Sequence, residues 1–113
     1  MFWSQQVAFD VLRSKGFASI TGSYSAVGSP TAHVVRLMCI TNTTDGDMLF
    51  SDDGVNDKLI LPASSYKLFD LTTNKGGTDG FLALQSGIQF YVKELTAPSK
   101  GSVYIELIYG KGE

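Results

Sequence analysis

The sequence has few of the side chains on which catalysis, metal binding and covalent cross-linking depend. Its 113 residues include a single cysteine, Cys39, and a single histidine, His33. One cysteine excludes an intrachain disulfide, and one histidine with one cysteine cannot form a structural zinc site within a chain. No Gly-x-Ser-x-Gly elbow accompanies His33, which disfavours a serine-hydrolase triad. We therefore expect no enzymatic activity and no cofactor, with His33 at a strand end and Cys39 as a small buried hydrophobe.

Long apolar segments and concentrated charge are also missing. No stretch approaches the roughly 18 consecutive apolar residues of a membrane span, so no membrane partner is expected. Residues 1–6 lack the basic and apolar regions of a secretory signal, which favours folding in a reducing cytoplasm. The net charge is −2, and the nine Lys and Arg residues are scattered along the chain. Binding to nucleic acid is therefore not expected either.

What the chain does have is a recurring pattern of short apolar strands separated by polar turns. Its 12 glycines are spread without a period, as expected of residues that form turns. The clearest instance is at residues 48–61, where apolar segments at 48–51 and 58–61 flank a turn rich in Asp and Gly. This arrangement predicts a β-hairpin, which ends at Pro62 because proline cannot donate to a central ladder.

Alternation of apolar and polar residues predicts most of the other strands. Residues 32–41 are instead almost continuously apolar, which predicts a strand that runs through the middle of a sheet, in the core. Residues 23–30 and 74–80 are small and polar and are expected to be loops. Strands are expected at residues 5–13, 17–21, 32–41, 48–51, 58–61, 65–72, 88–94 and 102–109. Together they predict one all-β domain over residues 1–113, a jelly-roll-like β-sandwich of about eight antiparallel strands.

The alternation also assigns side chains to the two faces of each strand. In residues 5–13, a half-buried strand is expected to carry its apolar side chains on one face. In residues 65–72, Tyr66, Leu68 and Asp70 are expected on one face, and Lys67, Phe69 and Leu71 on the other. The two sets predicted for residues 102–109 are Val103, Ile105, Leu107 and Tyr109 on one face, and Tyr104, Glu106 and Ile108 on the other.

An acidic segment is the one candidate for a metal site. Residues 45–57 contain five aspartates and no Lys or Arg. Such oxygen ligands suit Ca²⁺, but the spacing does not match an EF-hand loop. Asp and Gly are also the ordinary residues of hairpin turns, so turn formation is the competing interpretation. The five residues are Asp45, Asp47, Asp52, Asp53 and Asp57.

Several motifs in residues 40–110 resemble the small jelly-roll cement, decoration or staple proteins of tailed bacteriophage capsids. They are Ile40-Thr41-Asn42, Phe50 to Gly54, Leu61 to Tyr66, Gly87 to Lys93, and Pro98 to Tyr104. The resemblance implies a non-enzymatic virion structural protein that binds the major capsid protein and stabilises the shell. It also implies a homo-oligomer, dimer or trimer, on the capsid surface of a virion assembled in the host cytoplasm.

Aromatic side chains are the expected contacts with a partner. Phe2 and Trp3 either form an N-terminal arm within residues 1–4 that docks on a neighbour or cover the domain's own core. Tyr24 in the polar loop and Tyr109 at the end of the last strand are the other candidates. The alternative function is a glycan-binding β-sandwich module of a phage fibre or adhesin, because exposed tyrosines stack on sugars. A cupin-type metal enzyme is disfavoured, because such sites need several histidines.

Overall fold

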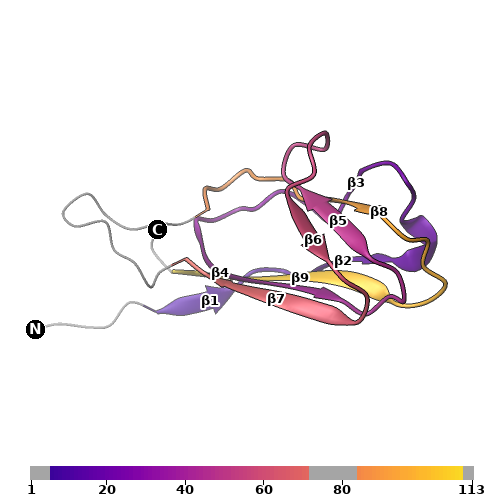
Figure 1. Cartoon of the computed structure of the whole chain (residues 1–113). Coiled ribbons are helices and arrows are strands. Elements are labelled where there is room, and N and C mark those ends of the chain that lie inside the picture. The colour runs from indigo at the N-terminus through magenta and orange to yellow at the C-terminus, as the bar shows by residue number, and fades with distance from the viewer. Residues whose placement is uncertain (1–5, 72–83, 111–113) are drawn as a thin grey trace, which may run out of the picture.

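The computed structural model describes residues 6–71 and 84–110, which fold as two facing antiparallel sheets with one 3₁₀ turn (Figure 1). No helix in these ranges is long and apolar enough to span a bilayer. The elements are β1 (Val7–Phe9), β2 (Arg13–Gly16), η1 (Phe17–Ser19), β3 (Ser25–Ala26), β4 (Val35–Asn42), β5 (Met48–Ser51), β6 (Leu59–Leu61), β7 (Ser65–Asp70), β8 (Tyr91–Glu94) and β9 (Ser102–Gly110).

The larger sheet has the strand order β1-β9-β4-β7, and β2 also pairs with β9. β1 pairs with the C-terminal end of β9, from Val7 opposite Gly110 to Phe9 opposite Ile108. β2 pairs with the preceding part of β9, beginning with Arg13 opposite Ile105. β1 and β2 are therefore one edge strand that is interrupted at residues 10–12.

Counting the interrupted strand once, the described part of the chain has eight strands, whose pairing is that of a jelly roll. The smaller sheet has the order β3-β8-β5-β6. The chain pairs like one long hairpin: the first strand with β9, β3 with β8, β4 with β7, and β5 with β6. The additional pairs β9–β4 and β8–β5 roll this hairpin into two sheets. The predicted all-β sandwich is confirmed.

Two of the predicted elements near the N-terminus were wrong. Residues 17–21 form no strand: Phe17–Ser19 is a 3₁₀ turn, and the Ile20 N–H donates to the Phe17 carbonyl at 3.2 Å. Of this segment only Ile20 enters the core, so its alternation does not correspond to a half-buried strand. The predicted loop at 23–30 contains the two-residue strand β3, which pairs with Tyr91 and Val92.

The core lies between the inner faces of the two sheets. A register shift between Val35 and Leu37 places Val35 and Met38 on the inner face of β4, and Leu37 on the outer face. β4 does lie between β9 and β7, as expected of a central strand. Its second face is not in the core, however, because Leu37 and Cys39 remain partly exposed. The largest fully buried side chains of the core are Phe50, Ile40, Met48, Leu61, Ile105 and Leu107.

Arg13 holds the interrupted edge strand against the loop that follows β3. Its side chain is 2% exposed, and its Nε and Nη2 donate to the carbonyls of Ser29 and Pro30 at 2.7 and 2.9 Å. Nη1 donates to the Val11 carbonyl at 3.0 Å and lies 3.4 Å from the Asp10 carboxylate. The buried cation is therefore surrounded by acceptors, as a buried charge requires.

Candidate functional site

The outer face of the larger sheet is the candidate site, because it is apolar yet uncovered. We define the outer face by the residues that the register directs away from the smaller sheet. On β1 these are Val7 and Phe9; on β4 Leu37, Cys39 and Thr41; on β7 Tyr66, Leu68 and Asp70; on β9 Tyr104, Glu106 and Ile108. The faces predicted for residues 65–72 and 102–109 are confirmed.

Large apolar side chains of the outer face are highly exposed. Phe9 is 79% exposed, Leu68 64% and Val7 62%. Phe9 and Leu68 border a shallow hollow of about 330 Å³, which Leu37, Cys39, Glu106 and Ile108 also line. Contiguous apolar surface of this kind is rare on monomeric proteins unless it binds something.

The alternation in residues 5–13 predicted the correct period, but its apolar side faces solvent. Cys39 is likewise not the buried hydrophobe that we expected: it is half-buried on the outer face, with Sγ 3.8 Å from Thr41 Oγ1. Both differences have one cause. Period two separates two faces but does not say which of them meets the second sheet.

One end of the outer face is rich in hydroxyl groups. Thr41 lies opposite Tyr66 on one side and Tyr104 on the other, and Tyr104 lies opposite Ser14 of β2. We call these four residues the hydroxyl row. Tyr66 is 68% exposed and borders a second hollow of about 290 Å³, lined by residues 41–43 and 64–66.

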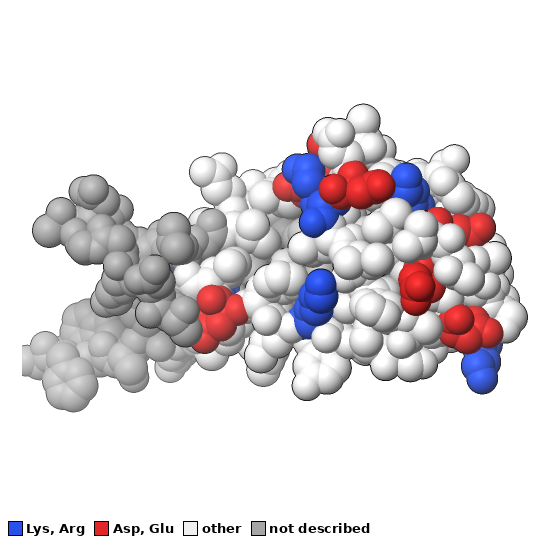
Figure 2. Space-filling view, viewed as in Figure 1, with Lys and Arg blue, Asp and Glu red and all other residues white. Residues whose placement is uncertain are grey.

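The hairpin turn of the smaller sheet carries a group of charged side chains, among them Asp52, Asp53 and Lys58. In Figure 2 several charged side chains lie at the top of the molecule, and others are spread over the middle and the right-hand end of the visible face. The outer face has two acidic residues: Asp70 lies at the end of β7, and Glu106 is an exposed carboxylate within the apolar part.

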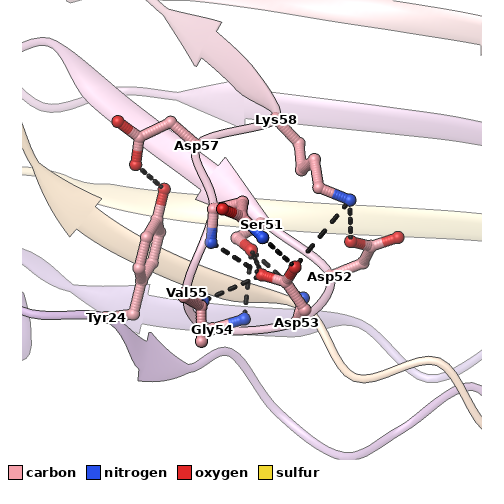
Figure 3. A network of polar contacts seen from close by, with 9 residues as sticks. Tyr24, Ser51, Asp52, Asp53, Gly54, Val55, Asp57 and Lys58 are labelled. Atoms are coloured by element: carbon pink, nitrogen blue, oxygen red, sulfur yellow. Dashed lines mark hydrogen bonds and ion pairs between the residues drawn. The ribbon is translucent and has the colours of Figure 1, made fainter.

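The hairpin turn between β5 and β6 is held by Asp53 (Figure 3). One carboxylate oxygen of Asp53 accepts from the Ser51 hydroxyl at 2.7 Å and from the Val55 and Asn56 N–H groups at 2.8 and 2.9 Å. These donors favour the ionised form and lower the pKa of Asp53 well below its usual range. The turn is thus organised by side chain to backbone bonds.

The other aspartates of the acidic segment each have a separate partner. Asp45 accepts from the Ser99 N–H at 2.7 Å, and Asp47 from the Ala63 N–H at 3.0 Å. Lys58 Nζ lies 2.9 Å from Asp52 (Figure 3). Within residues 6–71 and 84–110, no three His, Cys, Asp or Glu side chains are grouped as a metal site would need. The arrangement is that of turn-forming residues.

The tyrosines expected to contact a partner have partners of their own. The Tyr24 hydroxyl donates to Asp57 at 2.6 Å, and Lys93 Nζ lies 4.8 Å from the centre of its ring. Burial and the bond to Asp57 raise the pKa of Tyr24. Tyr109 stacks on His33, with ring centres 3.7 Å apart and planes inclined by 6°. Tyr24 and Tyr109 therefore do not form one site.

The other two predicted contacts, Phe2 and Trp3, lie outside the described residues, as does the 1–4 arm. The exposed residues Phe9 and Leu68 and the carboxylate of Glu106 were not predicted as contacts. The sequence signal for an apolar outer face was the nearly continuous apolar run of residues 32–41. A strand that is apolar on both faces needs a covering layer on each face, and in this molecule only the inner face has one.

No protein-family model and no curated protein matches this sequence. Among solved structures, the chain is similar to one in the cryo-EM structure of a virus-like particle of extra small virus of the giant freshwater prawn Macrobrachium rosenbergii. The two chains are 6% identical with a TM-score of 0.46, and the match covers 96% of this chain and 79% of that one. A likeness of this size carries no function from that chain to this one.

Proposed function

We propose that this protein is a non-enzymatic virion structural protein that binds capsid shell subunits through its outer face and thereby stabilises the shell. The single observation that carries the proposal is the exposure of Phe9, Leu68 and Val7 together on one sheet. Fully burying one such side chain contributes roughly 1.5–3 kcal/mol. Burial of these side chains against a partner therefore favours association, because they are exposed to water in the free molecule.

The size of the outer face suits a contact that is repeated many times. Four strands spaced about 4.8 Å apart, with about six residues along each strand, give an area of roughly 20 by 20 Å. That is about half of the ~800 Å² that each partner contributes to a standard interface. A single contact is therefore weak, and a symmetric shell or a dimer or trimer of this chain increases the avidity by repetition.

The choice of a capsid as partner rests on the fold and on the resemblance of residues 40–110 to phage cement proteins. Jelly rolls occur in viral capsid domains, lectins and cupins, so the fold limits the candidate functions to a few classes and does not select one of them. A cupin-type metal centre has little support, since the one histidine, His33, stacks on Tyr109. The proposed location is the capsid surface of a virion assembled in the host cytoplasm.

Co-sedimentation with empty shells from the source of the sequence tests the proposal. The variant carrying Phe9→Ser and Leu68→Ser is expected to lose binding and to keep its fold. Val55→Ser is the matched control, because Val55 is 76% exposed but lies in the hairpin turn of the smaller sheet. Equal pelleting of the double variant and the wild type would show that the outer face does not dock.

Phe2 and Trp3 stay predicted contacts, and the same assay tests them. If they form a docking arm, the variant carrying Phe2→Ala and Trp3→Ala binds the shell more weakly than wild type. Unchanged binding would leave them as cover for the domain's own core.

A second candidate function, glycan binding, is favoured by the hydroxyl row. Tyr66 and Tyr104 flank Thr41 on strands that lie roughly 10 Å apart, beside the 290 Å³ hollow. Aromatic rings next to hydroxyl groups suit stacking and hydrogen bonding to a sugar. A glycan array distinguishes the two functions: saturable binding that Tyr66→Ala abolishes and Tyr24→Phe leaves unchanged supports the glycan module, and an array without hits counts against it.

A further inference from the structure

Glu106 has an unusual place on the outer face. It points outward from β9 between Tyr104 and Ile108, and Cys39 lies opposite on β4, with Leu68 beyond Cys39 on β7. On its other side, residues 10–12 connect β1 and β2 alongside β9. Two side chains of this connection, Val11 and Leu12, are 64% and 55% exposed. The carboxylate is thus surrounded by apolar and aromatic residues.

No hydrogen bond or ion pair to the Glu106 side chain exists within residues 6–71 and 84–110. The acidic side chains of the hairpin differ in this respect, since Asp52, Asp53 and Asp57 each have a cation or donor. Asp70, the other acid of the outer face, also takes part in an interaction. Glu106 therefore keeps its full capacity to accept hydrogen bonds from another molecule.

We propose that the shell surface which covers the outer face presents a lysine or arginine side chain to Glu106, within an apolar surround. This inference rests on the proposed function. Docking removes water from Glu106, and a buried carboxylate without a partner strongly opposes association. A cation of the partner replaces the stabilisation that water gave to the Glu106 carboxylate. The net charge of −2 on this chain favours the approach of such a cation.

The same carboxylate excludes one occupant of the outer face. Two copies of this chain that paired face to face about an axis through Glu106 would place two carboxylates against each other. Like charges in such a position disfavour the complex. Self-pairing about that axis is therefore disfavoured, which fits a different chain as the occupant of the face.

Binding of wild type and variants to immobilised shells, measured as sodium chloride is raised, tests the inference. Glu106→Gln is expected to weaken binding by at least about tenfold and to reduce its salt dependence, and Glu106→Lys to abolish binding. The control is Glu94→Gln, which removes the same charge from the smaller sheet and is expected to bind as wild type does.

The outcomes separate this inference from the proposed function. If the variant carrying Phe9→Ser and Leu68→Ser loses binding while Glu106→Gln binds as wild type does, the outer face docks but its partner supplies no cation. If wild type itself does not bind shells, both statements are overturned. An equal loss with Glu106→Gln and Glu94→Gln would show that net charge, rather than a contact with Glu106, is what matters.

Discussion

Asn42 connects the loops at one end of the sandwich. Its Nδ2 lies 3.0 Å from the Gly46 carbonyl and 3.1 Å from the carbonyls of Leu61 and Pro62. Its Oδ1 accepts from the Thr44 N–H at 2.9 Å and from the Thr44 hydroxyl at 2.6 Å. Because Asn42 and Thr44 are fully buried, these bonds satisfy polar groups that water cannot reach. The Ile-Thr-Asn motif is therefore a structural feature of this fold.

Gly101 is required for two reasons that substitutions can separate. Its φ is +89°, and a Cβ there would lie 2.3 Å from the Thr43 carbonyl oxygen. Gly87 has a φ of +85° but no atom within 4 Å of a Cβ, and Gly22 has neither constraint. We expect Gly101→Ala to destabilise the protein most, Gly87→Ala by about 1–2 kcal/mol, and Gly22→Ala hardly at all.

Urea unfolding of the three glycine variants checks this order. Equal midpoints for Gly101→Ala and Gly87→Ala would show that the close approach of Thr43 does not matter.

Asp53 makes the free energy of unfolding depend on pH in the acidic range. Its pKa is lowered in the folded state by Ser51 and by the backbone N–H groups of Val55 and Asn56. A group with a depressed folded pKa stabilises the fold above its unfolded pKa of about 3.9, and this contribution is lost as pH falls toward the folded pKa. Asp53→Asn is therefore expected to lower the free energy of unfolding at neutral pH. Between pH 7 and about pH 3, the variant is expected to lose less stability than wild type does.

Urea midpoints of wild type and Asp53→Asn at both pH values provide the measurement. Parallel losses in the two proteins would contradict a special role of Asp53 in acid stability.

At the scale of elements, the larger sheet has one face that is buried in the core and one that is exposed. Leu107 points inward from β9 and is 1% exposed, whereas Leu68 points outward from β7 and is 64% exposed. Leu107→Ala removes packing from the core and is expected to cost about 2–5 kcal/mol. Leu68→Ala is expected to change stability by less than about 0.5 kcal/mol, because the free molecule has nothing packed on it.

Chemical denaturation of the two leucine variants tests whether the outer face is dispensable for folding. A large loss of stability with Leu68→Ala would mean that this face is covered within the molecule and is not available to a partner.

The elements that could be predicted from the sequence are those in which local pattern and tertiary pairing agree. The hairpin at 48–61 and the alternation at 102–109 are of this kind: the hairpin forms, and the strand at 102–109 has the expected faces. Residues 17–21 alternate without finding a partner strand, so the pattern alone was misleading there. The two-residue strand β3 exists because Tyr91 and Val92 lie beside it, which no local pattern records.

The candidate site was harder to predict, for a reason that Phe9 illustrates. A strand that alternates apolar and polar residues usually turns its apolar side to the core, but β1 turns only Ala8 inward. Which side faces solvent depends on how the edge strand joins β9. Tyr24 stays a predicted contact, and the sequence did not indicate that its hydroxyl donates to Asp57 within the molecule.

At the scale of the whole molecule, the charged hairpin turn and the apolar surface lie on different sheets. The hairpin turn of the smaller sheet carries Asp52, Asp53 and Lys58, whereas the outer face of the larger sheet is apolar around Glu106. Such a molecule has one side suited to water and another suited to a partner. On a shell it would bind by its outer face and leave the hairpin of the smaller sheet toward solvent.

The single cysteine allows the most direct measurement of this orientation. Cys39 lies on the outer face beside the hollow, so its rate of alkylation by iodoacetamide reports whether that face is covered. The rate should fall strongly when the protein is bound to shells, as followed by mass spectrometry of the Cys39 peptide. If shell-bound protein reacts at the rate of free protein, the outer face is not the docking surface.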